Sequence, residues 1–140
     1  MPPTERFVLD ASAAVTVLST ATGFAGLPGT SFAAPPLLWS EVTSVLHRAV
    51  VRHQVSAELG REVLRRLEDA PIRPEQPPGL FAAAWDVADA LDWSKTYDAE
   101  YLALARVLEC PLVTLDERQR RAAARLVPAG ALTLAQLVER

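Results

Sequence analysis

The sequence predicts a three-layer α/β/α sandwich built on a central, mostly parallel sheet of four or five strands. Two short apolar runs, residues 7–9 and 111–115, have the composition of buried strands, and helical patterns fill the chain between them. Because a parallel connection needs a long crossover, strands separated by helices are expected to pair in parallel. The length of 140 residues suffices for one hydrophobic core, so we expect a single domain over residues 1–140.

The individual elements follow from apolar spacing and from residues that begin or end helices. Proline is tolerated in a first helical turn, which places a helix start at Pro35 and Pro36, and Ser56 is a favourable N-cap. The proline-flanked residues 71–74 suit only an edge strand. In order, we expect a strand at 7–9, a helix at 11–18, a loop at 23–31, a helix from 35 to about 52, a helix after Ser56, the edge strand, helices at 79–91 and 98–109, a strand at 111–115, a helix to about 126, a short strand near 131–134 and a final helical turn or two.

Charge and composition limit the function classes. The chain carries 14 basic and 17 acidic residues, for a net charge of −3, whereas nucleic-acid binders are more often basic. A nucleic-acid partner would therefore have to bind a local basic patch. The apolar runs are too short for a membrane span, residues 1–6 lack the pattern of a signal peptide, and Cys110 has no second cysteine to pair with. We expect a cytoplasmic protein with no membrane contact.

Acidic residues follow the two clearest strands. Asp10 comes directly after residues 7–9, and Asp116 comes directly after residues 111–115. If these strands are neighbours, both carboxylates lie at the carboxyl edge of the sheet, where open α/β sheets place their sites. Glu41, among apolar neighbours in its helix, and Asp98, at the start of another helix, are two further candidates.

Four converging carboxylates would need a counter-charge, because they cannot all stay ionised in a desolvated cleft. A hard divalent cation supplies it, and Mg²⁺ or Mn²⁺ prefers carboxylate oxygens. An acidic cluster without a catalytic histidine or cysteine indicates phosphodiester hydrolysis assisted by such an ion. Each acid alone also has a structural interpretation, since Asp10, Asp98 and Asp116 can cap or open a helix and Glu41 can be a partly exposed helix acid.

Each of the four acids belongs to a distinctive segment of the sequence. The segments are residues 8–12 (Val-Leu-Asp-Ala-Ser), 36–42 (Pro-Leu-Leu-Trp-Ser-Glu-Val), 97–105 (Tyr-Asp-Ala-Glu-Tyr-Leu-Ala-Leu-Ala) and 112–118 (Leu-Val-Thr-Leu-Asp-Glu-Arg). They resemble the motifs of PIN domains, and of VapC-like toxins in particular. The resemblance spans residues 7 to about 126 in the same order and spacing, and the third segment is the most specific.

This resemblance implies a PIN fold and RNA cleavage that depends on Mg²⁺ or Mn²⁺, with no other cofactor. VapC-like toxins pair with a small antitoxin protein and form homodimers, so these partners are expected beside the RNA substrate. Ser44 stands where the family often has Asn, which is expected to weaken the polar network of the site slightly. By resemblance the metal-binding, catalytic acids are Asp10, Glu41, Asp98 and Asp116, oriented by the hydroxyl groups of Ser12 and Thr114.

A basic helical face follows the fourth acid. Arg118, Arg121 and Arg125 are spaced by three and four residues, so they share one face beyond Asp116. Such a face would suit an RNA backbone entering the site, and a solvated helix surface is the equally weighted alternative.

Three other functions compete with a ribonuclease. A PIN-fold binding module with little or no catalysis is the main alternative, and the presence of all four acids argues against it. Phosphotransfer receivers need an acid pair near the first strand and a late lysine, whereas Asp10 has no acidic neighbour and Lys95 is the sole lysine. Dehalogenase-like phosphatases need Asp-x-Asp, and position 12 is Ser.

Overall fold

The structure is a computed structural model that describes residues 4–140. Residues 1–3, part of the segment examined for a signal peptide, lie outside the described residues. The elements in order are β1 (Glu5–Leu9), α1 (Ala11–Leu18), the 3₁₀ helix η1 (Gly23–Gly26), β2 (Thr30–Ala34), α2 (Leu37–Val51), α3 (Ala57–Glu68), β3 (Ile72–Pro74), α4 (Leu80–Ala90), α5 (Tyr97–Leu108), β4 (Leu112–Val113), α6 (Glu117–Leu126), β5 (Ala131–Leu132) and α7 (Leu134–Val138).

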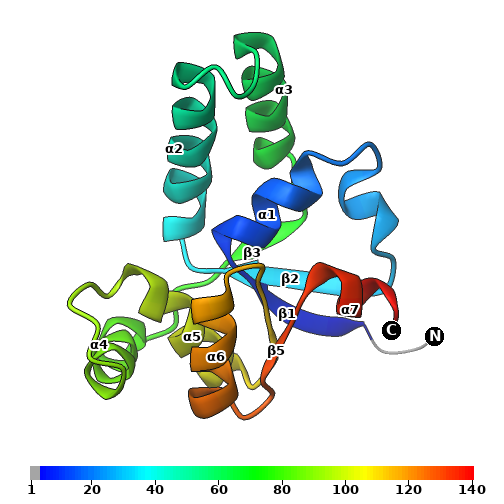
Figure 1. Ribbon diagram of the computed structural model, residues 1–140. Coiled ribbons are helices and arrows are strands. Elements are labelled where there is room, and N and C mark those ends of the chain that lie inside the picture. Colours follow the sequence, from blue (N-terminus) through cyan, green and yellow to red (C-terminus); the bar gives the residue numbers. More distant parts are fainter. Residues whose placement is uncertain (1–3) are drawn as a thin grey trace.

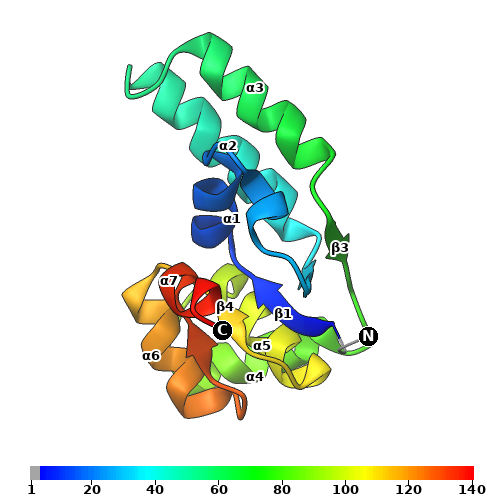
Figure 2. The same cartoon turned by 90° about the vertical axis from the view of Figure 1, so that its right-hand side faces the viewer.

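The five strands form one sheet in the order β3-β2-β1-β4-β5, and every neighbouring pair is parallel. Helices α1, α2 and α3 lie on one side of this sheet, and α4, α5 and α6 lie on the other (Figures 1 and 2). The predicted three-layer α/β/α sandwich with a parallel sheet is therefore confirmed. The α2–α3 pair extends away from the sheet as an antiparallel helical hairpin (Figure 2).

Two strands differ from the sequence prediction. The segment expected to be a loop over residues 23–31 contains η1, and β2 begins at its end. With only one large apolar side chain, Phe32, the strand has no clear alternation in the sequence. It forms because it lies between β1 and β3 and pairs with both, and because Phe32 packs on Phe7 with ring centroids 6.1 Å apart. Strand β4, by contrast, is shorter than the expected 111–115.

The core lies between the sheet and the two helical layers. Helix α5 is buried on nearly every side, since it packs against α4, α6 and β1. Helix α2 contributes an apolar stripe from the other layer. Fully buried side chains from the sheet and both layers include Phe7, Leu9, Leu38, Leu102 and Leu112. None of the helices formed by residues 4–140 has the length and apolar character needed to span a bilayer.

The order of the strands determines where a site can form. The chain leaves β1 for β2 on one side of it, and β4 returns to the opposite side. Open parallel sheets have a crevice at such a reversal, at the carboxyl ends of the strands. The register pairs Leu9 with Val113, so the residues that follow, Asp10 and Thr114, reach this edge together.

Candidate functional site

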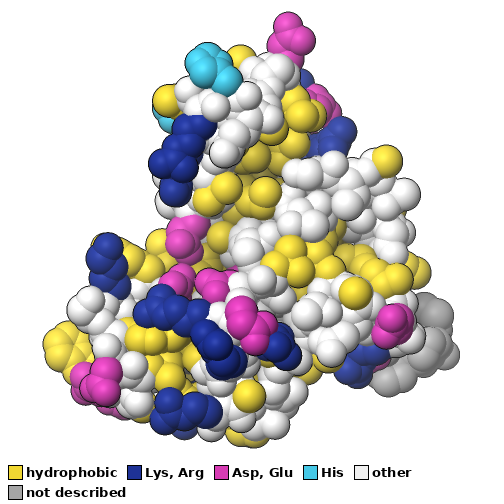
Figure 3. Space-filling view, viewed as in Figure 1, with side chains coloured by type: hydrophobic (Ala, Val, Ile, Leu, Met, Phe, Trp, Pro, Cys, Tyr) yellow, Lys and Arg dark blue, Asp and Glu magenta, His cyan; other side chains and the backbone are white. Residues whose placement is uncertain are grey.

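The four acids predicted from the sequence line one cavity. The cavity has a volume of about 320 Å³ and opens at the carboxyl edge of β1 and β4. In Figure 3, acidic side chains gather in the hollow between the α2–α3 hairpin and the helical layer below it, and basic side chains lie directly beneath them. The carboxylates come from four separate segments and are those of Asp10, Glu41, Asp98 and Asp116.

Asp10 is the most buried of the four acids, with 4% of its surface exposed. It is the N-cap of α1, and its Oδ1 accepts hydrogen bonds from the Ala13 backbone N–H at 3.0 Å and the Ser12 hydroxyl at 2.7 Å. Its Oδ2 accepts a hydrogen bond from the hydroxyl of Thr114. The capping role and the position in the cavity are therefore compatible, because capping uses only one carboxylate oxygen.

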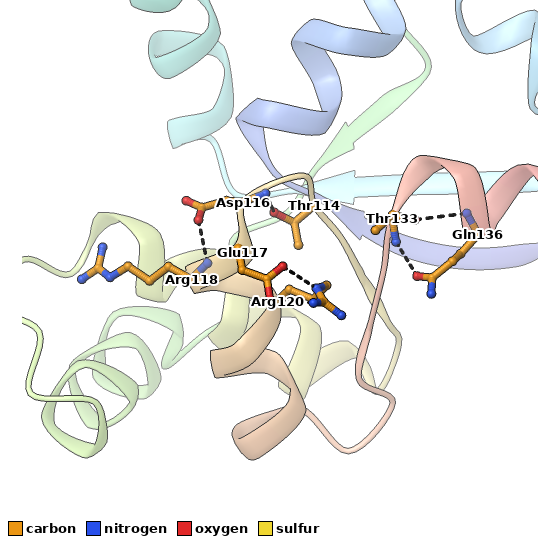
Figure 4. A network of polar contacts seen from close by, with 7 residues as sticks. All are labelled: Thr114, Asp116, Glu117, Arg118, Arg120, Thr133 and Gln136. Carbon is orange, nitrogen blue, oxygen red and sulfur yellow. Dashed lines mark hydrogen bonds and ion pairs between the residues drawn. The ribbon is translucent and has the colours of Figure 1, made fainter.

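Both hydroxyl groups that contact Asp10 are themselves held by the backbone after β4. The Leu115 N–H donates to Ser12 Oγ at 3.0 Å, and the Asp116 N–H donates to Thr114 Oγ1 at 3.0 Å. Each hydroxyl accepts a hydrogen bond from a backbone N–H of the loop and donates a hydrogen bond to Asp10. These two relays tie the first and fourth acidic segments together, and Figure 4 shows the hydrogen bond between Asp116 and Thr114 in the second of them.

Glu41 lies in the second turn of α2 and is half-buried. Its Oε1 accepts a hydrogen bond of 2.5 Å from the hydroxyl of Tyr101, which projects from α5 on the other side of the sheet edge. The apolar pattern of the helix expected at residues 98–109 turns Tyr101 inward together with Leu102 and Leu108, and so indicates a core residue. The ring is indeed buried, and its polar tip reaches the cavity and holds Glu41.

Asp98 and Asp116 form the more exposed side of the cavity. Asp98 lies in the first turn of α5, and Asp116 is the N-cap of α6, where it accepts a hydrogen bond from the Arg118 backbone N–H at 2.9 Å. The Arg118 side chain extends away from Asp116 (Figure 4) and brings its Nη1 within 3.6 Å of Asp98 Oδ2. The same guanidinium lies 4.0 Å from the centroid of the Trp93 ring.

The residues that form this fold and cavity match a known family. Residues 7–125, most of the chain, match the family model described as the PIN domain. The chain belongs to the PIN-domain family.

Relatives of this PIN domain carry VapC names. VapC ribonuclease Mb0985 of Mycobacterium bovis is 37% identical over 84 residues, which are 60% of this chain and 64% of that protein. The match thus spans less than two thirds of that relative's length. Ribonuclease VapC1 of Mycobacterium tuberculosis is 36% identical over 120 residues, which are 81% of this chain and 88% of that protein. The chain is therefore a VapC-like PIN domain, as its sequence motifs indicate.

A solved structure supports the fold of this PIN domain. The crystal structure of PAE2754 from Pyrobaculum aerophilum matches it with a TM-score of 0.77, over 98% of this chain and 89% of that one. The sequence identity is 19%, so the likeness concerns the fold alone.

The cavity of the PIN domain penalises negative charge. Burial raises the pKa of Asp10 above its ordinary value, although hydrogen bonds from Thr114, Ala13 and Ser12 oppose the shift. Burial also raises the pKa of Glu41 and of Asp98, and neighbouring carboxylates add to both shifts. Each of these acids therefore gains from a nearby positive charge.

The donor atoms of the PIN domain suit a hard divalent cation. The side chains that line the cavity offer oxygen donors and no histidine or cysteine, which is the ligand chemistry that Mg²⁺ and Mn²⁺ prefer. Asp10 accepts three hydrogen bonds, and a carboxylate has about four lone-pair sites, so Oδ2 keeps room for a cation. Within residues 4–140, no three His, Cys, Asp or Glu side chains are already arranged to hold a metal ion, so binding requires the less buried acids to turn inward.

Other predicted residues lie near the cavity or apart from it. Arg118 is at the rim, whereas Arg121 and Arg125 are exposed further along α6. Ser44 is exposed and lines a different hollow with His47, so it is not a wall of the acidic cavity.

One cavity residue, Gln119, is not predicted from the sequence, and the only signal for it is its position three residues after Asp116, on the same helical face.

Proposed function

We propose that this VapC-like PIN domain is a metal-dependent endoribonuclease that acts as the toxin of a toxin–antitoxin pair. The proposed centre binds Mg²⁺ or Mn²⁺ through Asp10, Glu41, Asp98 and Asp116. The observation that carries the proposal is that these four acids, from four distant segments, line one cavity at the carboxyl edge of the sheet. The VapC ribonuclease names of the relatives support RNA as the substrate.

The side chains of the cavity have distinct parts in this proposal. Asp10 is the fixed acid, because three hydrogen bonds hold its carboxylate in one orientation. Glu41 is oriented by Tyr101, and the more exposed Asp98 and Asp116 are free to adjust around the ion. A bound Mg²⁺ or Mn²⁺ supplies positive charge for the phosphoryl oxygens and makes a water molecule more acidic.

Basic residues at the rim suit the RNA backbone. Arg118 stands beside the acidic cavity, and Arg121 and Arg125 continue in the same direction along α6. Phosphate groups are positioned by such arginines without base recognition. RNA that runs from this helix to the cavity would bring a phosphodiester bond to the acids. This local basic surface would bind the RNA although the chain as a whole has a net charge of −3.

The partners in the proposal are a small antitoxin protein and a second copy of the chain, both by similarity to VapC proteins. The apolar surface of α4 supports self-association, because Phe81 and Trp85 lie one turn apart and are 61% and 65% exposed. A cytoplasmic location follows from the proposed RNA substrate.

Cleavage of a mixed pool of structured RNA tests the proposal. The purified protein is incubated with Mg²⁺, Mn²⁺ or EDTA, beside Asp98→Asn and the control Asp89→Asn, which changes an exposed aspartate of α4 outside the cavity. We expect metal-dependent cleavage by the wild-type protein and by Asp89→Asn, and none by Asp98→Asn. Folded protein that binds Mn²⁺ and RNA without cutting would instead make the chain a binding module. Absence of both binding and cleavage would refute the proposed centre.

A further inference from the structure

One residue that lines the acidic cavity has a buried polar atom without a hydrogen-bond partner. Gln119, the third residue of α6, is 2% exposed and lines the cavity beside the four acids. Its Oε1 is buried and has no hydrogen-bond partner among the described residues. Buried acceptors are nearly always paired, because leaving one unpaired costs about 1–3 kcal/mol. The position therefore needs an explanation.

The orientation of the Gln119 amide is determined by its other end. Nε2 donates a hydrogen bond of 3.1 Å to the backbone carbonyl oxygen of Asp98. Only the NH₂ group of an amide can donate to a carbonyl, so Oε1 must be the unpaired atom, and exchanging the two ends would place two oxygens in contact. The amide thus joins the first turn of α5 to α6 and leaves a neutral oxygen buried and unpaired in a residue that lines the acidic cavity.

The surroundings of this oxygen offer few partners. The charged side chains that line the cavity are all carboxylates, and an ionised carboxylate can only accept hydrogen bonds. The two hydroxyl groups that line the cavity, those of Ser12 and Tyr101, already donate to Asp10 and Glu41. A water molecule that hydrates a bound cation is a donor from outside the chain. Mg²⁺ keeps several water molecules when carboxylates bind it, and these are strong donors.

We propose that Gln119 is a positioning residue of the cation site, whose Oε1 accepts a hydrogen bond from the hydration shell of the ion while Nε2 fixes the Asp98 segment. This inference rests on the proposed cation site. It adds a neutral acceptor to the four acids and couples the ion to the junction of α5 and α6. A purely structural role would use Nε2 alone.

Calorimetric titration with Mn²⁺, paired with thermal unfolding in EDTA, separates the two roles. We expect Gln119→Leu to bind Mn²⁺ about 10–100-fold more weakly, the usual effect of losing a group that supports metal ligands. The control Gln76→Leu, at an exposed loop position, should leave affinity unchanged.

The outcomes distinguish this inference from the proposed function. If the wild type and Gln119→Leu bind Mn²⁺ equally, and Gln119→Leu only lowers the unfolding midpoint in EDTA, Gln119 is structural and the inference is wrong. If the wild type binds no Mn²⁺, the cation site itself is wrong. Should Gln119→Leu fail to fold, Gln119→Met, which keeps a long unbranched side chain, replaces it with the same expected loss of affinity.

Discussion

The guanidinium of Arg118 stacks on the ring of Trp93, 4.0 Å from its centroid, while its Nη1 stands 3.6 Å from Asp98. The two contacts hold a positive charge at the rim of an acidic cavity. Neither contact follows from the sequence, because Trp93 belongs to the connection before α5 and Arg118 to α6. An arginine held in this way is positioned to bind a phosphate group.

Replacement of Arg118 by alanine is therefore expected to weaken binding of single-stranded RNA in EDTA and to reduce the salt dependence of binding by about one phosphate contact. Trp93→Leu should have a smaller effect, about 2–5-fold, because a cation–π contact at a partly exposed site contributes about 0.5–1 kcal/mol. Fluorescence anisotropy over a range of salt concentrations measures both. Arg120→Ala removes an arginine that pairs with Glu117 and is the control; an equal loss in Arg118→Ala and Arg120→Ala would mean that only total charge matters.

The stability of the metal-free protein should fall as pH rises. Asp10, Glu41 and Asp98 have raised pKa values, chiefly through burial, so the folded state binds their protons more tightly than the unfolded state. Their favourable contribution is complete below the ordinary pKa of about 4 and is lost as pH passes through the raised values. Urea unfolding in EDTA from pH 4.5 to 7.5 should show this decline, and excess Mg²⁺ should reduce it. A free energy of unfolding that increases with pH in EDTA across this range would contradict the prediction.

Two conservative changes in the acidic cavity should differ in their effects on folding. Asp98→Asn is expected to leave the metal-free midpoint unchanged or higher, because it removes a charge that burial and Asp116 disfavour. Asp10→Asn turns an NH₂ group toward groups that donate to the carboxylate, which costs about 1–3 kcal/mol. Both variants should lose cleavage activity. Thermal unfolding in EDTA checks the difference, and equal midpoints would show that the hydrogen bonds to Asp10 do not determine its role.

Self-association through α4 is expected to depend on its exposed aromatic side chains. Trp85→Glu places a charge beside Phe81 on this surface and should weaken a dimer at least about tenfold, since aromatic residues dominate apolar interfaces. Sedimentation velocity over a range of concentrations measures this. Val51→Glu, at an equally exposed apolar position at the end of α2, is the control. A dimer that survives Trp85→Glu and dissociates with Val51→Glu would place the interface on the helical hairpin.

The main parts of the fold could be predicted from local patterns. Asp10 and Asp116 could be predicted because each directly follows an apolar run of the sequence, and a parallel sheet brings the ends of neighbouring strands together. Strand β2 could not be predicted, because its pairing with two neighbours, rather than its composition, makes it a strand. The prediction of a final short strand near residues 131–134 is confirmed, since β5 covers Ala131–Leu132.

The polar contacts of the cavity depend on tertiary packing. Tyr101 and Glu41 are 60 residues apart, and their hydrogen bond exists only because α2 and α5 meet at one sheet edge. Gln119 looks like an ordinary polar residue in a helix rich in arginine, and its burial results from the approach of α5. The spacing of residues in the sequence does not indicate these contacts between distant helices.

The relay from Thr114 to Asp10 spans 104 residues, and this has a consequence for protein synthesis. On the ribosome, Asp10 is synthesised well before β4 (Leu112–Val113), so its contacts with the loop after β4 cannot form at first. Until β4 joins the sheet, β1 is an open edge and Asp10 lacks both hydroxyl relays from the loop after β4. A nascent or prematurely terminated chain that stops before this strand has no assembled centre. The proposed nuclease therefore becomes active only after β4 has been synthesised and has joined the sheet.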